Sequence, residues 1–242
     1  MRPFLLLSSR AEDLAAEEEY GSFLRCTGLE EHELRRIRLE RGPLPDLELD
    51  RYAGIVLGGG PFNSSDPDAE KSAVQRRVEA DLARLLDEVV ARDVPFLGAC
   101  YGIGTLGTHQ GGVVDRTYGE PISAVRVRLT PEGLVDPLLA GMPAEFEAFV
   151  GHKEACRVLP PSATLLAGSA GCPVQMFRVG RNVYATQFHP ELDVPGLITR
   201  VHVYQHAGYF DPGELSELVD GIRTAVVTEP GRILATFVAR YG

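Results

Sequence analysis

The chain has 242 residues and a formal net charge of −10 at pH 7, and 44% of its residues are hydrophobic. The acidic balance argues against a nucleic-acid-binding surface and suits a protein that handles small molecules. No apolar stretch approaches the ~18 residues of a membrane span, and residues 1–13 lack the apolar core of a signal peptide. We therefore expect a cytoplasmic protein without a membrane partner.

Strands and helices alternate through the first hundred residues. Continuous apolar runs predict buried strands, and apolar side chains that recur every three to four residues predict helices. The predicted strands are 4–7, 33–40, 53–57 and 94–99, and the predicted helices are 12–24 and 71–92. Strands that are apolar on both faces favour a parallel sheet covered by helices on each side.

The second half of the chain reads as short strands followed by helices. The predicted strands are 113–114, 124–129, 146–150, 164–167, 174–179 and 183–187, and the predicted helices are 195–206, 214–227 and 230–241. No linker separates the two halves, so we expect an α/β fold with one domain over residues 1–242. Its C-terminal helices, within residues 194–242, should pack on that domain.

The segment Pro95–Gly104 reads PFLGACYGIG, so an apolar strand ends at Cys100 between two glycines. In the related pattern G-x-S-x-G the nucleophile stands on a strained turn between a strand and a helix, and glycine lets the two elements cross closely. A helix over residues 103–109 would favour the thiolate of Cys100, and the N–H of Tyr101 would face the oxygen of an attacked carbonyl. The alternative is that Cys100 is a small buried hydrophobe, as free cysteines often are.

A second strand also ends at a residue that suits catalysis. Residues 184–191 read YATQFHPE, with His189 at the strand end and Glu191 two residues later. A cysteine nucleophile needs a base, and the base needs an orienting carboxylate, which His189 and Glu191 could supply. A lone histidine at a strand end is more often structural, so this hypothesis depends on His189 meeting the cysteine.

The remaining histidine pair and cysteines carry no comparable pattern. His202 and His206 have the i, i+4 spacing of a metal-binding pair, but without a third ligand nearby we expect an exposed helix face. Cys26, Cys156 and Cys172 lack the glycine frame, and we expect them to be unreactive free thiols.

A glycine-rich loop, Gly58–Pro61, follows the predicted strand 53–57. It lacks the G-K-S/T of a P-loop and the G-x-G-x-x-G of a dinucleotide site. Glycine amides can approach a developing negative charge closely, so the loop suits an oxyanion hole, with a plain tight turn as the alternative.

Together, GGGP at residues 58–61, GACYG at 98–102 and QFHPE at 187–191 resemble the three signature segments of the class I (triad-type) glutamine amidotransferases. The segments around them look most like those of the glutaminase domain of GMP synthetase, and the similarity covers residues 53–191. The resemblance implies a flavodoxin-like, open and mostly parallel sheet with helices on both faces. It also implies a catalytic triad at Cys100, His189 and Glu191, and an oxyanion hole at the amides of Gly60 and Tyr101.

The resemblance also locates a substrate pocket, with two departures from the family. The expected substrate contacts are Gly59, Gly104, Gly151 and His152. The family usually has glutamine where Gly104 stands, and S-H-G-D where residues 151–154 read GHKE. Both departures touch the glutamine pocket and leave the triad intact. The implied site needs no cofactor and no metal ion.

Three functions follow as hypotheses. The first is a thiol hydrolase that releases ammonia from the glutamine side chain through a glutamyl thioester. Because no ATP-pyrophosphatase segment follows Glu191, its ammonia would pass to a separate synthetase subunit. The second is a γ-glutamyl peptidase or hydrolase that acts on other γ-glutamyl compounds, which Gly104 favours. The third is a catalytically silent binding or regulatory module, which the intact triad disfavours.

Overall fold

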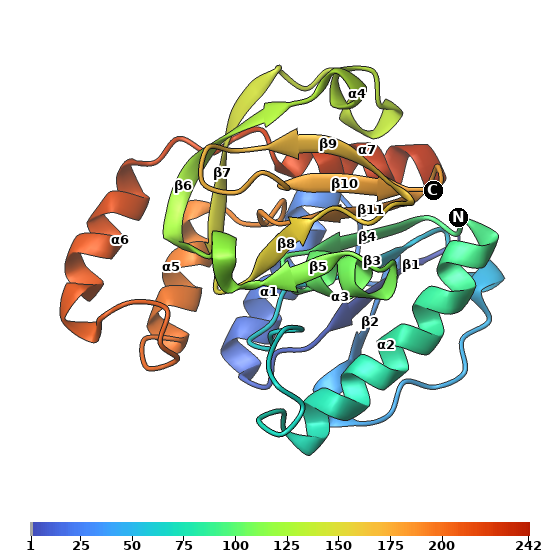
Figure 1. Ribbon diagram of the computed structural model, residues 1–242, viewed down its shortest axis with the longest axis horizontal. Helices are drawn as coiled ribbons and strands as arrows, with labels where there is room; N and C mark the ends of the chain where they lie inside the picture. The colour runs from blue at the N-terminus through green and yellow to red at the C-terminus, as the bar shows by residue number, and fades with distance from the viewer. Residues whose placement is uncertain (1) are drawn as a thin grey trace.

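A nine-stranded sheet forms the centre of the protein in a computed structural model that describes residues 2–242 (Figure 1). In spatial order its strands are β2 (Leu34–Arg38), β1 (Phe4–Ser8), β3 (Ile55–Leu57), β4 (Phe96–Ala99), β11 (Val183–Thr186), β10 (Met176–Val179), β9 (Ala163–Gly168), β6 (Glu120–Leu129) and β7 (Glu145–His152). The first five strands run parallel to one another, and each later strand runs antiparallel to its neighbour. A separate two-stranded sheet pairs β5 (Val113–Asp115) with β8 (Ala155–Val158).

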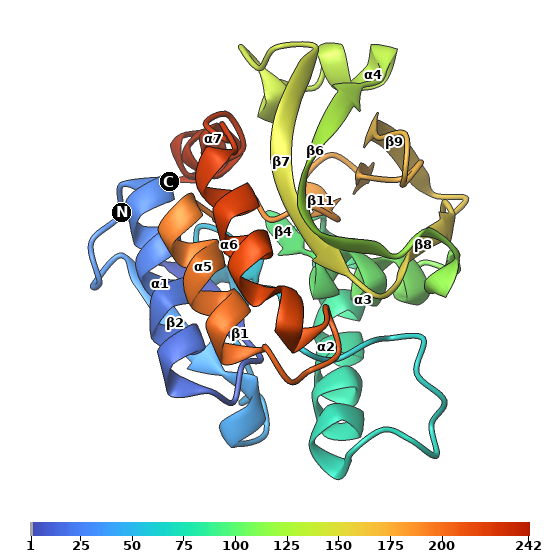
Figure 2. The ribbon, with the colours of Figure 1, turned by 90° about the vertical axis from the view of Figure 1, so that its left-hand side faces the viewer.

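Helices cover both faces of the parallel half. On one face α7 (Gly231–Tyr241), α1 (Asp13–Thr27), α5 (Val194–Val203) and α6 (Leu215–Thr224) contact one another in that order, and α6 also contacts β6. In Figure 2, α1, α5 and α6 lie side by side, with α7 above them. The opposite face carries α2 (Ala73–Arg92) and α3 (Tyr101–His109). The short helix α4 (Pro131–Leu134) packs near β9 and β6.

Strand β1 shows why the parallel strands are continuously apolar. Phe4 and Leu6 pack on the side of α1 and α7, where Phe4 meets Phe237. Leu5 and Leu7 point to the other face and pack in the cluster that holds α2 and α3. Because successive side chains of a strand alternate between faces, a strand covered on both sides must be apolar at every position.

The long helix α2 follows the predicted pattern. Its N-terminus is capped by Ser72, whose hydroxyl accepts a hydrogen bond from the amide of Gln75 at 3.0 Å. Its core-facing side chains recur at three- and four-residue spacing and are Val78, Leu82, Leu85, Leu86 and Val89. The helix ends at Arg92, and the next residue, Asp93, caps it in the left-handed conformation.

The expected α/β architecture is confirmed, although several elements differ in detail. Helix α4 was not predicted, and the predicted helix 214–227 ends at Thr224. Strand β8 was not predicted, and the predicted strand 33–40 ends at Arg38 because a tight helical turn follows it. The predicted helix 195–206 ends at Val203, so His206 lies beyond it. Within residues 2–242, every helix is too short or too polar to cross a membrane.

Candidate active site

Two neighbouring strands deliver Cys100 and His189 to the same edge of the sheet. Strands β4 and β11 are parallel neighbours, with Ala99 beside Thr186, and the amide of Cys100 donates to the carbonyl of Thr186 at 2.8 Å. The carboxyl ends of parallel strands share one edge of a sheet, where open α/β folds place their ligand sites. The amide of His189 donates to the carbonyl of Phe149 at 3.0 Å, which ties the histidine to β7.

Cys100 stands on a strained turn between β4 and α3. Its backbone has φ 51° and ψ −94°, in a region that residues other than glycine rarely adopt. A Cβ on Gly98 would lie 2.9 Å from the Cα of Gly102, so the strand and the helix cross too closely for a side chain at position 98. A Cβ on Gly102 would make ordinary contacts, the nearest at 3.5 Å, so the close crossing explains the glycine before the cysteine and not the one after it.

His189 is held by a buried carboxylate. Its Nδ1 lies 2.8 Å from Oε1 of Glu191, which is fully buried. Burial alone would lower the pKa of His189, but the Glu191 carboxylate and the neighbouring Cys100 raise it to about 9. Burial would raise the pKa of the Glu191 carboxyl, yet the charges of His189 and Arg200 hold it well below its usual range. The site therefore stabilises a charged imidazolium at neutral pH.

A buried charge network behind the histidine was not predicted from the sequence. Arg200 Nη1 donates to Oε1 of Glu191 at 2.8 Å and lies 3.2 Å from Nδ1 of His189. Arg200 Nε lies 3.3 Å from Oε2 of Glu18, and Arg10 Nε donates to Oε1 of Glu19 at 2.9 Å. One available signal is that Arg10 lies just after the buried strand β1, at the sheet edge that also carries the cysteine.

The other cysteines are buried or half-buried, and the histidine pair is exposed but does not form the expected helix face. Burial raises the pKa of the Cys26 and Cys156 thiols to about 11 and that of Cys172 to about 12, which disfavours the reactive thiolate. His202 and His206 are exposed. Because α5 ends between them, they do not form an i, i+4 helical pair.

Cys100 lies between two small cavities. The first, which we call the imidazole-side cavity, measures about 50 Å³ and is lined by His189, Arg200 and Tyr204 among others. The second, the amide-side cavity, measures about 20 Å³. Its walls include Tyr101, His152, Glu154 and Gln187. The residues that line both cavities are Gly60, Cys100, Gly151 and Tyr209.

The glycine loop packs against buried polar groups at the site. A Cβ on Gly59 would lie 2.6 Å from Cε1 of His189, and one on Gly60 would lie 2.1 Å from Oγ of Ser9. Within residues 2–242, the amides of Gly60 and Tyr101 donate no hydrogen bond to the protein. Tyr101 is the first residue of α3, where an amide has no partner inside its own helix. Both amides are thus available at the edge of the Cys100 cavities.

The two departures from the family pattern meet in space. A Cβ on Gly104 would lie 2.8 Å from Oε1 of Glu154 and 3.0 Å from Oγ of Ser64. The Glu154 carboxylate accepts hydrogen bonds from the amides of Ser64 and Ser65, each at 2.7 Å. The glutamate therefore fills the space that a larger residue at position 104 would need. Gly104 is in the wall of neither Cys100 cavity.

One group of side chains has the ligand types of a metal site. The ligand atoms of Glu120, His152 and Cys172 lie within 4.8 Å of one another. His152 Nε2 lies 3.0 Å from Oε2 of Glu120, and its Nδ1 lies 2.9 Å from the carbonyl of Glu154. These contacts explain the buried position of His152 as a link between β6, β7 and the turn that follows.

The family model and the similar protein sequences agree with one another. The family model described as glutamine amidotransferase class-I matches residues 30–195. A glutamine-hydrolyzing GMP synthase subunit of Thermococcus kodakarensis is 29% identical over 151 residues, which are 62% of this chain and 72% of that protein. GMP synthase (glutamine-hydrolyzing) of Leifsonia xyli subsp. xyli is 31% identical over 152 residues, which are 61% of this chain and 27% of that protein.

Solved structures share the fold at lower sequence identity. A glutamine amidotransferase from Thermotoga maritima superposes with a TM-score of 0.75 at 18% identity, covering 100% of this chain and 98% of that one. A glutamine amido transferase from Methylobacillus flagellatus superposes with a TM-score of 0.71 at 22% identity, covering 100% of this chain and 94% of that one.

Proposed function

Because the chain belongs to the class I glutamine amidotransferase family of C–N hydrolases, we propose that it hydrolyses the side-chain amide of glutamine through a glutamyl thioester on Cys100. The observation that carries this proposal is the meeting of Cys100 and His189 at neighbouring strand ends, with Glu191 2.8 Å behind the imidazole. A strained nucleophile, a base and an orienting carboxylate are the parts that thiol acyl transfer requires.

In the acylation half, the Cys100 thiolate attacks the amide carbon of glutamine and a C–S bond forms. The negative charge moves to the amide oxygen, where the free amides of Gly60 and Tyr101 can donate hydrogen bonds; each such donor is typically worth about 3 kcal/mol. The His189 imidazolium gives its proton to the amide nitrogen, the C–N bond breaks and ammonia leaves. The raised pKa of His189 favours the charged imidazole that this step needs.

In the deacylation half, the neutral His189 takes a proton from water, and the resulting hydroxide attacks the thioester carbon. The C–S bond then breaks, glutamate leaves and the Cys100 thiolate returns beside the imidazolium. Throughout the cycle Glu191 holds Nδ1 of His189 in place and stabilises its positive charge.

The glutamyl part of the substrate fits best on the amide-side cavity. Gln187, which lines that cavity, is 1% exposed, and its Oε1 has no hydrogen-bond partner among the described residues. A buried acceptor without a partner is costly, and the α-ammonium group of a glutamyl substrate would supply the missing donor. Gly151 and His152, which line this cavity, and Gly59, which packs against His189, remain proposed neighbours of the substrate, whereas Gly104 would face it only through Glu154.

We expect substrate entry to involve movement of the segment after α5. The amide-side cavity is far smaller than a glutamine molecule, and Tyr209 lines both Cys100 cavities. Lys153 fastens that segment, because its Nζ donates to the carbonyl of Ala207 at 2.6 Å and lies 4.5 Å from the Tyr209 ring centre. We expect the segment to open for glutamine and to close over the thioester, which excludes bulk water.

The proposal extends to the protein that takes up the released ammonia. Several relatives are named as one subunit of a GMP synthase, and the chain spans 72% of the first of them. This supports a separate synthetase as the acceptor of ammonia. A second candidate function is the hydrolysis of other γ-glutamyl compounds, which is favoured by Glu154 in the wall of the amide-side cavity and by Gly104, which makes room for it from behind.

The test is a glutaminase assay on the purified protein, alone and with candidate synthetase subunits. We expect equal release of glutamate and ammonia from glutamine, and none from Cys100→Ala. Cys26→Ala is the matched control, because its thiol is half-buried and unreactive, and it should keep full activity. Full activity in folded Cys100→Ala, or no glutamate under any of these conditions, would contradict the proposal.

A further inference from the structure

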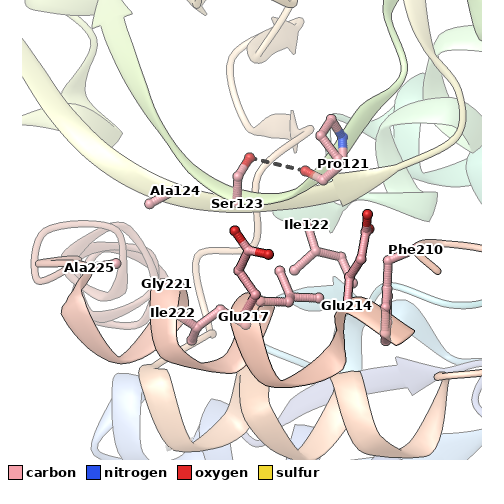
Figure 3. Close-up of a pocket in the computed structure, with 11 residues that line it drawn as sticks. Pro121, Ile122, Ser123, Ala124, Phe210, Glu214, Glu217, Gly221, Ile222 and Ala225 are labelled. Carbon is pink, nitrogen blue, oxygen red and sulfur yellow. Dashed lines mark hydrogen bonds between the residues drawn. The ribbon is translucent and has the colours of Figure 1, made fainter. Parts of the chain in front are cut away.

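We infer that the site also hydrolyses γ-glutamyl amides whose amine extends beyond the scissile bond and ends in a second, positively charged group. This inference rests on the thiol hydrolysis of the proposed function and names a further substrate class of the same site. It comes from a cleft of about 600 Å³ between β6 and α6, which we call the β6–α6 cleft. Figure 3 shows β6 above the cleft and α6 below it. A cleft of this volume is in the range that binds small molecules.

The β6–α6 cleft adjoins the active site. Ile122 of β6 lines both the cleft and the imidazole-side cavity. Tyr209 borders the imidazole-side cavity, and the next residue, Phe210, borders the cleft. Ile122 and the segment 209–210 thus form the partition between the two spaces. This is the segment that we expect to move for a substrate to enter.

The chemistry of the reaction points the leaving group toward this partition. His189 must deliver a proton to the departing nitrogen, so that nitrogen leaves on the imidazole side of Cys100. When the substrate is glutamine, the departing group is ammonia and has no use for a neighbouring cleft of 600 Å³. When the amide nitrogen carries a substituent, that substituent extends past His189 toward Ile122 and the cleft.

The walls of the cleft select the chemistry of the substituent. Its apolar side chains, Ile122, Leu218 and Ile222, suit a chain of methylene groups. The charged groups in its wall are the carboxylates of Glu214 and Glu217, both of which Figure 3 shows pointing from the helix side toward β6. Within residues 2–242, neither carboxylate has an ion-pair or hydrogen-bond partner, while most acidic residues of the neighbouring strands are paired.

Apolar walls with two free carboxylates fit the γ-glutamyl amide of an aliphatic diamine. In this substrate the Cys100 thiolate attacks the γ-carbonyl, the C–N bond breaks and the proton from His189 goes to the departing nitrogen. The diamine leaves in place of ammonia, and water then releases glutamate as before. Its far ammonium group pairs with Glu214 and Glu217 while the methylene groups lie against the apolar wall.

The test compares three substrates: glutamine, the γ-glutamyl amide of 1,4-diaminobutane, and γ-glutamyl-n-pentylamide. The last has a methyl group where the diamine has its ammonium group, so the pair differs in charge and little in length. Glu214 and Glu217 are exposed, so we expect kcat/KM for the charged amide to exceed that for the neutral amide by at most about fivefold, the worth of an exposed ion pair. The preference should fall as the salt concentration rises.

Variants then test whether Glu214 and Glu217 cause the preference for the charged amide. In Glu217→Gln, and more fully in Glu214→Gln/Glu217→Gln, the ratio of kcat/KM between the charged and the neutral amide should fall toward one. Glu132→Gln, an exposed glutamate on α4, is the matched control and should keep the ratio. Among the γ-glutamyl amides of diamines with two to six methylene groups, one chain length should give the highest kcat/KM. That length reports the distance from Cys100 to the carboxylates.

The outcomes separate this inference from the proposed function. Hydrolysis of glutamine with no preference for the charged amide, or a preference that the glutamate variants keep, overturns the diamine inference and leaves the glutaminase proposal standing. Failure to release glutamate from any of the three substrates overturns both.

Discussion

Replacing Glu191 by glutamine should remove the charge that makes His189 a strong base. The substitution keeps the size of the side chain and a hydrogen-bond acceptor near Nδ1, which lies 2.8 Å from the carboxylate. It removes the negative charge and leaves the burial of His189 unchanged. Since burial alone lowers the pKa of the imidazole, we expect that pKa to fall in the variant.

The size of the effect follows from the raised pKa of His189. A pKa of about 9 lies about 2.5 units above the ordinary value of 6.5, and at about 1.4 kcal/mol per unit this is about 3 kcal/mol of net stabilisation of the imidazolium. The charge of Glu191 is the largest contribution in that direction. The pKa of His189 should therefore drop by at least one unit in Glu191→Gln, and kcat/KM should fall about a hundredfold at neutral pH.

The assay is an NMR titration of histidines labelled with carbon-13, with the His189 signal assigned by its absence in His189→Asn. The same preparations give kcat/KM as a function of pH. Glu132→Gln, which removes an exposed carboxylate far from the site, should leave the His189 titration unchanged. If His189 in folded Glu191→Gln still titrates near pH 9, the carboxylate does not set the charge of the imidazole, and the electrostatic explanation of the site is wrong.

Three further predictions test the surroundings of the imidazole. Arg200→Met removes the buried guanidinium beside Glu191 and Glu18, so that Glu191 keeps only His189 as a charged partner. It should lower the free energy of unfolding by about 3–5 kcal/mol in urea denaturation, whereas Arg126→Met at an exposed ion pair should change it by less than about 1 kcal/mol; equal losses would show that burial of the network is unimportant. Gly59→Ala places a Cβ 2.6 Å from Cε1 of His189 and should lower kcat by about a hundredfold, whereas Gly42→Ala, with open space around it, should leave kcat unchanged. A fully active Gly59→Ala would contradict the tight packing of the glycine loop against His189. Because the pKa of His189 is raised in the folded state, the stabilisation from its charged form is fully present below about pH 6.5 and is lost as the pH rises through about 9. The free energy of unfolding of the wild type should therefore lose up to about 3 kcal/mol of its advantage over His189→Asn across that range, and an advantage that stays constant would refute the linkage.

The sequence predicts the parallel half of the fold and the residues at its strand ends. Runs such as Phe4–Leu7 are apolar at every position because helices cover both faces of the sheet, so local composition carries the signal. The glycines that frame Cys100 and the HPE of residues 189–191 are likewise local patterns. Their meeting follows from the adjacency of β4 and β11, which family resemblance implies and periodicity alone does not.

The parts that escaped prediction depend on contacts between distant segments. Arg10 and Arg200 belong to one buried charge network although 190 positions separate them; Arg10 has a local signal in its place just after an apolar strand, and nothing local marks Arg200 as buried. The sequence shows that the GHKE segment departs from the family pattern, but it does not show that the Glu154 carboxylate fills the space beside Gly104. The pairing of the antiparallel strands also escaped prediction, because strand composition alone does not reveal which strands pair.

The most direct test of the central claim is mass spectrometry of the protein quenched in acid during turnover. With glutamine as the substrate, we expect a γ-glutamyl adduct on the peptide that contains Cys100, and no adduct on that peptide in Cys100→Ala. Turnover of glutamine with no adduct on Cys100, or with the adduct on another residue, would contradict the account.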